Sequence, residues 1–341
     1  MKVSASRAVL LLPWIENAAQ NPKGRFSNEN YLENENDKQR IVIILGPTAS
    51  GKTDLAVRLA ERFDGEIVNA DSMQVYRGMD IGTAKPSLEL RRKIPHHLID
   101  IVDPDMNFSA SDFRREATRA IEDIAGRGKN VFIVGGAGLY IRVLLQGLVD
   151  SPSGAGEVRQ ELEEKATPEG IAALVNELNR VDPVTAALLH PNDRVRIIRA
   201  LEVYRLTGVP ISRERIAHGF SGDYYRALKI GLTVERRELY GRIDSRVEGM
   251  IAKGLVAEVK ILLDRGFSPR LKALRSIGYR QICAYISGEY SLAEAIRLIK
   301  RDTRHYAKRQ MTWFNNDNEI KWVEYSDIFA SIYKNVIEFF A

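Results

Sequence analysis

The sequence IVIILGPTASGKT, residues 41–53, decides the fold class. Its first five residues form a continuous apolar run, which is typical of a parallel strand buried on both faces. The next eight fit the pattern G-x-x-x-x-G-K-[ST], in which a glycine-rich turn leads from a strand into a helix. Apolar residues at helical spacing then follow from Thr53 to Phe63. This order of strand, glycine loop and helix indicates an α/β fold.

The same alternation recurs on the C-terminal side of this stretch. Short apolar runs at 66–70, 130–134 and 227–233 predict further strands, and 113–126 predicts a helix. Further helices are expected at 236–265, 272–287 and 291–315, with a last strand at 320–323. Since strands that alternate with helices are joined by crossovers, we expect a P-loop NTPase-like core, a parallel sheet with helices on both faces.

Two other parts of the chain differ from this core. Residues 151–156 have the composition of a linker, and helical patterns follow them, so we expect a small all-helical insertion domain at 149–219. The core then comprises 41–148 and 220–341. Residues 1–40 combine a short apolar run with a polar, acidic stretch. We expect a disordered leader there, with an organellar transit peptide or a secretory signal as alternatives.

Composition narrows the class of protein. The 341 residues include 50 Lys and Arg against 45 Asp and Glu, a net charge of +5, which is too small an excess to establish nucleic-acid binding. A single cysteine, Cys283, excludes an intramolecular disulfide and a cysteine-rich zinc module, and it favours a reducing compartment. No stretch reaches transmembrane length. We therefore expect a cytoplasmic protein with no membrane partner, and a monomer by default.

The glycine loop predicts phosphate binding. Its backbone N–H groups converge on phosphate oxygens, and the helix N-terminus adds positive potential. Lys52 supplies a charge, and the Thr53 hydroxyl is a candidate Mg²⁺ ligand. The predicted phosphate-binding residues are Gly46, Pro47, Thr48, Ala49, Ser50, Gly51, Lys52 and Thr53.

The pattern leaves the phosphate ester open. Most NTPases of this type place a magnesium-binding aspartate after a second buried strand, but 130–134 is followed by two glycines. Asp100 or Asp103 is an alternative. Asp71 directly follows the predicted strand 66–70 and reaches the same sheet edge as the glycine loop, where it can act as a general base. A turn or N-cap aspartate is the alternative interpretation of Asp71.

Longer motifs resemble a known family, the tRNA dimethylallyltransferases. The sixteen-residue run DSMQVYRGMDIGTAKP at 71–86 carries most of the resemblance. The other matching motifs are the glycine loop, PHHLID (95–100), FRR (113–115), GGAGLY (135–140), HPND (190–193), RALEV (199–203), SIGYRQ (276–281) and AKRQMTWF (307–314). They cover about residues 41–325 in order.

The resemblance implies transfer of a dimethylallyl group from dimethylallyl diphosphate to the exocyclic amine of the tRNA adenosine at position 37. The glycine loop then holds the prenyl diphosphate rather than a nucleotide, with Mg²⁺ at Thr53. Asp71 is implied as the general base. Arg242 and Arg246 are implied diphosphate ligands, and of the two we expect Arg242 to be catalytic together with Asp71 and Thr53.

The resemblance also implies contacts with the anticodon stem-loop. The predicted tRNA-binding residues are Asp71, Ser72, Met73, Gln74, Ala137, Arg159, Val195, Arg196, Ile197, Ile198, Arg199, Arg275, Ser276, Ile277, Gly278, Tyr279 and Arg280. Arg194 and a basic stretch from Arg297 to Arg309 are further candidates. The family commonly has threonine where this chain has Ala137, so we expect weaker or slower tRNA engagement.

Other functions remain open from the residues alone. One is a small-molecule kinase in which Asp71 binds the acceptor hydroxyl, and another is an RNA-binding NTPase module without transfer chemistry. His96 and His97 have no third His or Cys nearby, so we expect structural roles rather than metal ligation.

Overall fold

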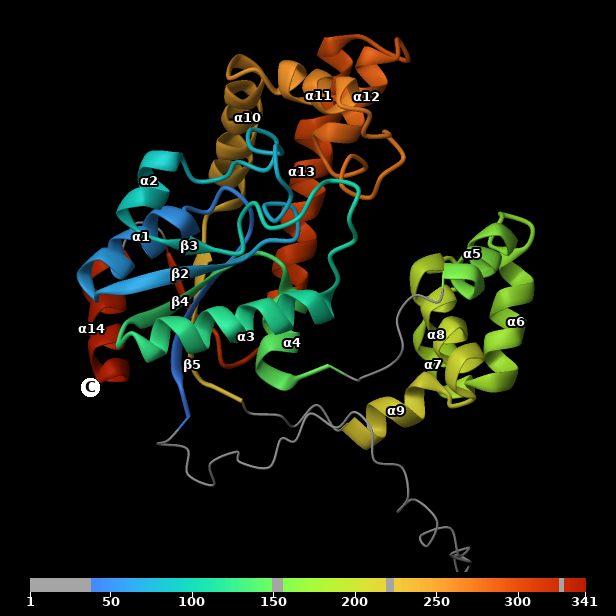
Figure 1. The fold of residues 1–341 in the computed structure, drawn as a ribbon, viewed down its shortest axis with the longest axis horizontal. Helices are drawn as coiled ribbons and strands as arrows, with labels where there is room; N and C mark the ends of the chain where they lie inside the picture. Colours follow the sequence, from blue (N-terminus) through green and yellow to red (C-terminus); the bar gives the residue numbers. More distant parts are fainter. Residues whose placement is uncertain (1–37, 149–155, 219–223, 325–327) are drawn as a thin grey trace, which may run out of the picture. The chain divides into compact units, whose positions relative to one another are not determined.

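The computed structural model describes residues 38–148, 156–218, 224–324 and 328–341 (Figure 1). The predicted leader lies outside the described residues up to Asp37. In the described part of the chain, no helix is both long enough and apolar enough to cross a membrane.

A six-stranded parallel sheet forms the centre of the core, in the order β3-β2-β4-β1-β5-β6. The strands are β1 (Arg40–Leu45), β2 (Gly65–Ala70), β3 (His96–His97), β4 (Asn130–Gly135), β5 (Arg226–Thr233) and β6 (Lys321–Glu324). Gly135 pairs with Leu45 on one side and with Ala70 on the other. The carboxyl ends of β1, β4 and β2 therefore meet at one edge of the sheet.

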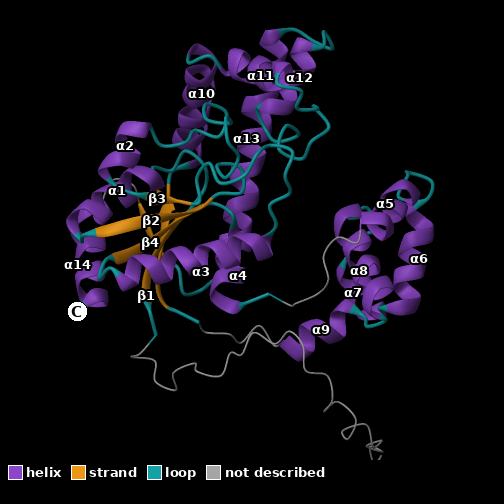
Figure 2. Ribbon diagram, viewed as in Figure 1, coloured by secondary structure: helices purple, strands orange, loops and turns teal. Residues whose placement is uncertain are grey.

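Helices cover both faces of this sheet (Figure 2). The helices packed against its strands are α1 (Lys52–Arg62), α3 (Ala110–Gly126) and α14 (Ile328–Phe340). The core also contains α2 (Leu88–Lys93), α4 (Gly138–Gln146), α10 (Arg236–Ala252), α11 (Leu255–Asp264), α12 (Tyr279–Ile286) and α13 (Leu292–Phe314). Alternate residues of β1 enter different cores: Ile43 packs with α3 and α4, whereas Ile44 packs with α1 and α14. The predicted α/β class is thus confirmed.

Several predicted elements have different limits in the structure. The single helix expected at 236–265 is divided into α10 and α11, because Gly254 adopts a φ of 98° that continues neither helix. The helix expected at 272–287 begins only at Tyr279, after Gly278 at φ 94°. The sequence prediction contained no β3, α2, α4 or α14. β3, α2 and α4 are short or lie beside glycines, so their periodicity is weak, whereas the 13-residue α14 has a helical apolar pattern that the sequence prediction missed.

Residues 156–218 are all helical and have a core of their own. The helices are α5 (Gly156–Lys165), α6 (Ile171–Val181), α7 (Pro183–Leu188), α8 (Arg194–Thr207) and α9 (Ile211–His218). Leu162, Leu174, Leu178 and Leu201 form the centre of this cluster, each at most 2% exposed. The buried Asp182 caps α7 through the Thr185 N–H and also accepts from the Ser212 N–H.

Candidate active site

The phosphate loop connects β1 to α1 as predicted. Gly46 has no room for a side chain, because a Cβ would lie 2.7 Å from the carbonyl oxygen of Leu232. Gly51, at φ 92°, is the N-cap of α1, and no side chain caps the helix. The N–H groups of the first turn therefore remain available to an anion.

Lys52 lies where its ammonium charge and the charge of a bound phosphate would neutralise each other. Its Nζ donates to the carbonyl oxygen of Pro47 at 2.6 Å, within the same loop. Burial and the nearby Arg246 guanidinium lower the pKa of Lys52 to about 7, and the Asp71 carboxylate offsets part of this change. Lys52 and Arg246 thus both lie within reach of the Asp71 charge.

Asp71 lies directly after β2, at the sheet edge predicted for it. Its Oδ1 accepts hydrogen bonds from the N–H groups of Met73, at 2.8 Å, and Gln74, at 3.3 Å. These two bonds form a turn, as in the alternative interpretation of Asp71 as a turn aspartate. Within the described residues, however, Oδ2 has no hydrogen-bond partner. One oxygen therefore fixes the carboxylate, and the other is available to a substrate.

The structure favours Arg246 over Arg242 as the arginine of this site. The charge of Asp71 acts on Arg246, whose pKa is lowered by burial. Among the described residues, no carboxylate forms an ion pair with Arg246. Arg242, one turn earlier on α10, pairs with Glu238 at 2.6 Å. We therefore prefer Arg246 to the expected Arg242 as the arginine that we propose for the diphosphate.

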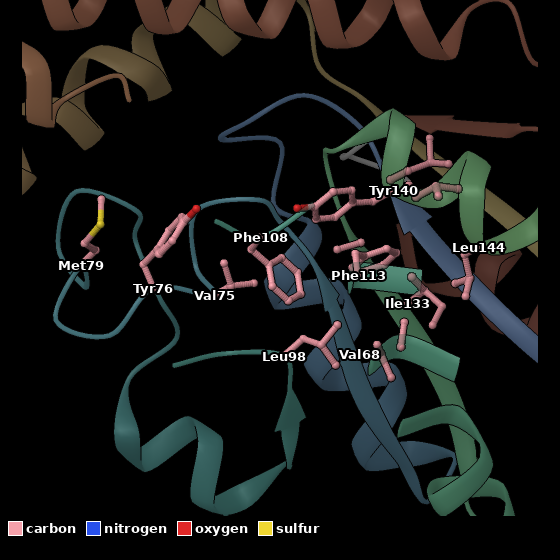
Figure 3. Packing of buried hydrophobic residues seen from close by; sticks show 14 of the residues in the cluster. Val68, Val75, Tyr76, Met79, Leu98, Phe108, Phe113, Ile133, Tyr140 and Leu144 are labelled. Carbon is pink, nitrogen blue, oxygen red and sulfur yellow. The ribbon is translucent and has the colours of Figure 1, made fainter. Parts of the chain in front are cut away.

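Two tyrosines that the sequence did not single out as site residues border Asp71. Burial and the Asp71 charge raise the pKa values of Tyr140 and Tyr306, so both hydroxyls remain protonated. Tyr140 stacks on Phe113 with ring centroids 4.2 Å apart. Figure 3 shows its hydroxyl pointing toward that of Tyr76. The spacing between these residues in the chain gives no signal, because α13 and α4 meet Asp71 only in the folded sheet.

The signature segment 71–86 is anchored by α11 and α12. The Glu258 carboxylate accepts from the N–H groups of Asp80, Ile81 and Gly82, at 2.9, 2.7 and 3.1 Å. The Tyr279 hydroxyl donates to the same carboxylate at 2.6 Å. Tyr279 is 0% exposed, so its side chain fixes this segment and is not presented to tRNA as predicted.

Lys85 anchors the C-terminal end of the segment 71–86. Its buried Nζ donates to the Tyr76 carbonyl at 2.6 Å and pairs with Asp80 and Asp100 at 2.7 and 2.5 Å. Arg91 also pairs with Asp100, at 2.7 Å. Asp100 is therefore part of a structural ion network, which argues against it as the substitute magnesium ligand.

The two histidines of β3 have structural contacts, as expected. His97 Nε2 lies 2.7 Å from Glu66, a buried carboxylate that Arg127 also binds. His96 Nδ1 lies 2.7 Å from the carbonyl oxygen of Ile94. Among the described residues, no group of three or more His, Cys, Asp or Glu side chains could hold a metal ion.

The predicted tRNA-binding residues of α8 divide into exposed and buried ones. Val195 and Arg196 are exposed, whereas Ile197 and Ile198, at 1% and 3% exposed, belong to the apolar core of 156–218. Their side chains therefore support α8 from within, which corrects the prediction that they contact tRNA. Arg199 binds Glu202, a fully buried carboxylate, at 2.8 Å.

The other predicted tRNA-contacting residues also differ in exposure and in ion pairing. Arg159 also reaches Glu202, at 3.4 Å, and the Arg194 guanidinium donates to the Glu163 carbonyl at 2.6 Å. Arg275 is exposed, and the exposed Arg280 pairs with Asp302. Ser276, Ile277 and the 71–74 group are half-buried, whereas Gly278 is buried.

Most cations of the basic stretch on α13 are already paired. Four carboxylates hold them in the pairs Arg297–Glu294, Lys300–Glu248, Arg301–Asp302 and Arg304–Asp244. Two of these pairs join α13 to α10. The stretch is therefore largely a structural surface, which reduces its value as a phosphate-binding surface.

Ala137 is the N-cap of α4, and no side chain caps this helix. Its N–H donates to the carbonyl oxygen of Ala70, at 3.3 Å, one residue before Asp71. A threonine hydroxyl at this position could accept from the first turn of the helix, so the alanine leaves that turn without a side-chain partner.

The donor set at the phosphate loop fits magnesium. Thr53 is exposed at the first turn of α1 and offers one hydroxyl oxygen. Mg²⁺ commonly keeps several waters and takes its other ligands from substrate phosphates, so a single protein oxygen beside a diphosphate site suits it.

A glycine loop at the carboxyl edge of a parallel sheet, with a buried lysine and a flanking arginine, defines a phosphate-loop protein. A family model described as IPP transferase matches residues 74–317. The chain belongs to this family, the tRNA dimethylallyltransferases.

Similar proteins agree over most of the chain. It is 69% identical to "tRNA dimethylallyltransferase 2" of Geotalea uraniireducens, over 89% of this chain and 98% of the relative. It is 62% identical to "tRNA dimethylallyltransferase" of Geobacter metallireducens, over 90% of this chain and 99% of the relative.

Two solved structures resemble the fold. The tRNA isopentenylpyrophosphate transferase of Bacillus halodurans matches with a TM-score of 0.65 at 41% identity, covering 89% of this chain and 97% of that one. A eukaryotic dimethylallyltransferase described as acting on tRNA matches with a TM-score of 0.75 at 30% identity, covering 88% and 78%. These relatives support the transferase interpretation over the kinase.

Proposed function

We propose that this protein transfers a dimethylallyl group from dimethylallyl diphosphate to the exocyclic amine of the adenosine at position 37 of tRNA. The observation that carries the proposal is the coupled group of Lys52, Arg246 and Asp71. It joins a diphosphate site to a carboxylate with one available oxygen.

Asp71 acts on the acceptor side of the reaction. The adenine amine is a weak nucleophile, so it must be held in position and lose a proton as the N–C bond forms. Asp71 Oδ2 accepts a hydrogen bond from the amine and then its proton. The turn around Oδ1 keeps this carboxylate from rotating away.

The phosphate loop acts on the donor side. The C–O bond to the allylic carbon breaks, and negative charge accumulates on the leaving diphosphate. The N–H groups at the start of α1, the Lys52 ammonium and the Arg246 guanidinium stabilise this charge. The Thr53 hydroxyl would hold a bound Mg²⁺, which would add positive charge beside the leaving group.

The tRNA must present its adenine outside the base stack. Extrusion of a base costs a few kcal/mol, and contacts with the phosphate backbone and with unstacked neighbouring bases compensate for it. The exposed residues Arg196, Arg275 and Arg280 remain the proposed contacts with the anticodon stem-loop.

We further propose that the enzyme works as a monomer in the cytoplasm.

One transfer assay tests the proposed function. Unmodified tRNA, dimethylallyl diphosphate and Mg²⁺ are incubated with the enzyme, and the nucleosides are identified by mass spectrometry, with ATP as a parallel donor. Prenylated adenosine beside the anticodon, formed only from the prenyl diphosphate, is the expected result. ATP turnover without a prenylated product would contradict the proposal and favour the kinase.

A further inference from the structure

Gln310, on α13, connects the phosphate loop to the loop that follows β4. Its Oε1 accepts the N–H of Thr48 at 2.9 Å, and its Nε2 donates to the carbonyl of Gly136 at 3.0 Å. The side chain is 6% exposed. A Cβ at Gly136 would lie 2.1 Å from Nε2, so a larger residue there would displace the Gln310 amide.

These contacts fix one peptide of the phosphate loop. A loop of this kind binds phosphate only when its N–H groups point in particular directions. Gln310 holds the Thr48 N–H toward α13 and thereby sets the orientation of the residues that lead to Gly51 and Lys52. Gln310 also interacts with the Tyr306 hydroxyl, which borders Asp71.

We propose that Gln310 is a positioning residue, which shapes the phosphate loop for the prenyl diphosphate and keeps it in register with the acceptor side. This inference rests on the proposed function. Gln310 touches neither reacting group in this scheme and acts through the Thr48 and Gly136 backbone.

The chain offers a matched control for this residue. Gln281, on α12, is 2% exposed, accepts a backbone N–H from Gly278 at 2.9 Å and donates to Asp302 at 2.9 Å. Gln281→Met therefore also removes one bond accepted from a backbone N–H and one bond donated to an oxygen, in this case the Asp302 carboxylate rather than a backbone carbonyl, away from the phosphate loop.

The experiment measures the Kd of dimethylallyl diphosphate by calorimetry and the KM of each substrate in the transfer assay. We expect both variants to lower the melting temperature, and Gln310→Met alone to raise the donor Kd and KM about tenfold, a change of about 1.4 kcal/mol. The KM for tRNA should stay within about twofold. Equal donor affinities in Gln310→Met and Gln281→Met would overturn the proposal. So would a Gln310→Met variant whose KM values for the donor and for tRNA rise equally.

A second variant gives a readout that a merely structural role would not move. In Gln310→Glu, the ionised carboxylate can still accept from Thr48 but cannot donate to Gly136, and it places negative charge near the diphosphate. Once protonated, the carboxyl group can accept from Thr48 and donate to Gly136. Donor affinity should therefore recover relative to wild type as the pH falls, and a ratio that does not change with pH would contradict the proposal.

Donor binding is measured without tRNA, so the two hypotheses can fail separately. Normal donor binding without transfer would reject the proposed function, while the comparison of Gln310→Met with Gln281→Met would still decide the role of Gln310. A wild-type protein that does not bind the donor would overturn both.

Discussion

The two oxygens of the Asp71 carboxylate have different surroundings. Oδ1 is held by two backbone N–H groups, and Oδ2 faces the site without a partner in the described residues. An asparagine keeps the first arrangement, because its Oδ1 accepts the same bonds. It replaces the second oxygen with an amide that donates and cannot take a proton.

Asp71→Asn is therefore expected to reduce turnover by about 10²–10⁴-fold. The binding of tRNA, measured by filter retention, should change less than twofold, because the turn is preserved. Asp64→Asn is the control, since Asp64 is exposed, pairs with Lys129 at 2.9 Å and lies at the opposite end of β2 from Asp71. Unchanged turnover in Asp71→Asn would exclude the general-base role.

The protonation of Lys52 is expected to change on donor binding. In the free enzyme, its pKa of about 7 leaves the amine mostly neutral at pH 8. A bound diphosphate favours the charged ammonium and raises this pKa, so binding at pH 8 takes up a proton. At pH 6 the amine is already charged, so the uptake is lost. Donor affinity should accordingly fall as the pH rises above about 7.

Calorimetry in buffers of different ionisation enthalpy measures this uptake. Lys52→Arg is the matched variant, because its guanidinium stays charged and any remaining uptake belongs to the diphosphate itself. The same proton uptake in both proteins at pH 8 would show that Lys52 is charged before the donor binds.

At the scale of elements, α11 and α12 hold the signature segment through a single carboxylate. Glu258 accepts three backbone N–H groups and the Tyr279 hydroxyl. Hydrogen bonds to a charged group contribute about 1.5–3 kcal/mol each. The segment that carries Asp71 at its start is thus fixed at its middle by helices that the chain reaches about 180 residues later.

Tyr279→Phe is expected to lower the free energy of unfolding by about 1.5–3 kcal/mol, because it removes one of these bonds. Urea unfolding measures the change. The dependence of tRNA affinity on salt should not change, because the Tyr279 hydroxyl is buried on Glu258. A stable variant with weakened tRNA binding would instead restore the tRNA-contact role expected from the sequence.

The sequence predicted much of this arrangement and missed the rest for physical reasons. The glycine loop and Asp71 could be placed because their signals are local, a motif and the end of an apolar run. Tyr306 and Gln310 could not, because their roles depend on how α13 crosses the sheet edge. Arg242 and Arg246 lie four residues apart, and only the ion pair of Arg242 with Glu238 separates their roles.

Over the whole molecule, the net charge of +5 overstates how many cations are free to bind phosphate. The α13 cations are largely paired with carboxylates, and the exposed Arg196 on α8 also pairs with Asp193. Each of these cations therefore contributes less to the attraction of tRNA than its formal charge suggests.

Arg194→Gln with Arg196→Gln tests the contribution of α8. The slope of log affinity for tRNA against log salt should decrease in magnitude by about 0.7–0.9 for each phosphate that the variant no longer neutralises. Lys93→Gln with Arg119→Gln is the control, because both are exposed cations that pair with a glutamate, as Arg196 pairs with Asp193, and neither is a predicted tRNA contact. Arg199 is left intact, since its replacement would remove the closer of the two arginines that pair with the buried Glu202. An unchanged slope in the α8 variant would remove these residues from the tRNA interface.

The strand order also has a consequence for synthesis of the chain. β1 lies between β4 and β5, and residues 156–218 are made before β5 exists. At about 5–20 residues per second, the interval between β4 and β5 leaves one edge of β1 unpaired for on the order of ten seconds, a state that favours aggregation. The helices of 156–218 have their own apolar core and can fold during this interval. Completion of the catalytic edge is thus a late event in the life of the nascent chain.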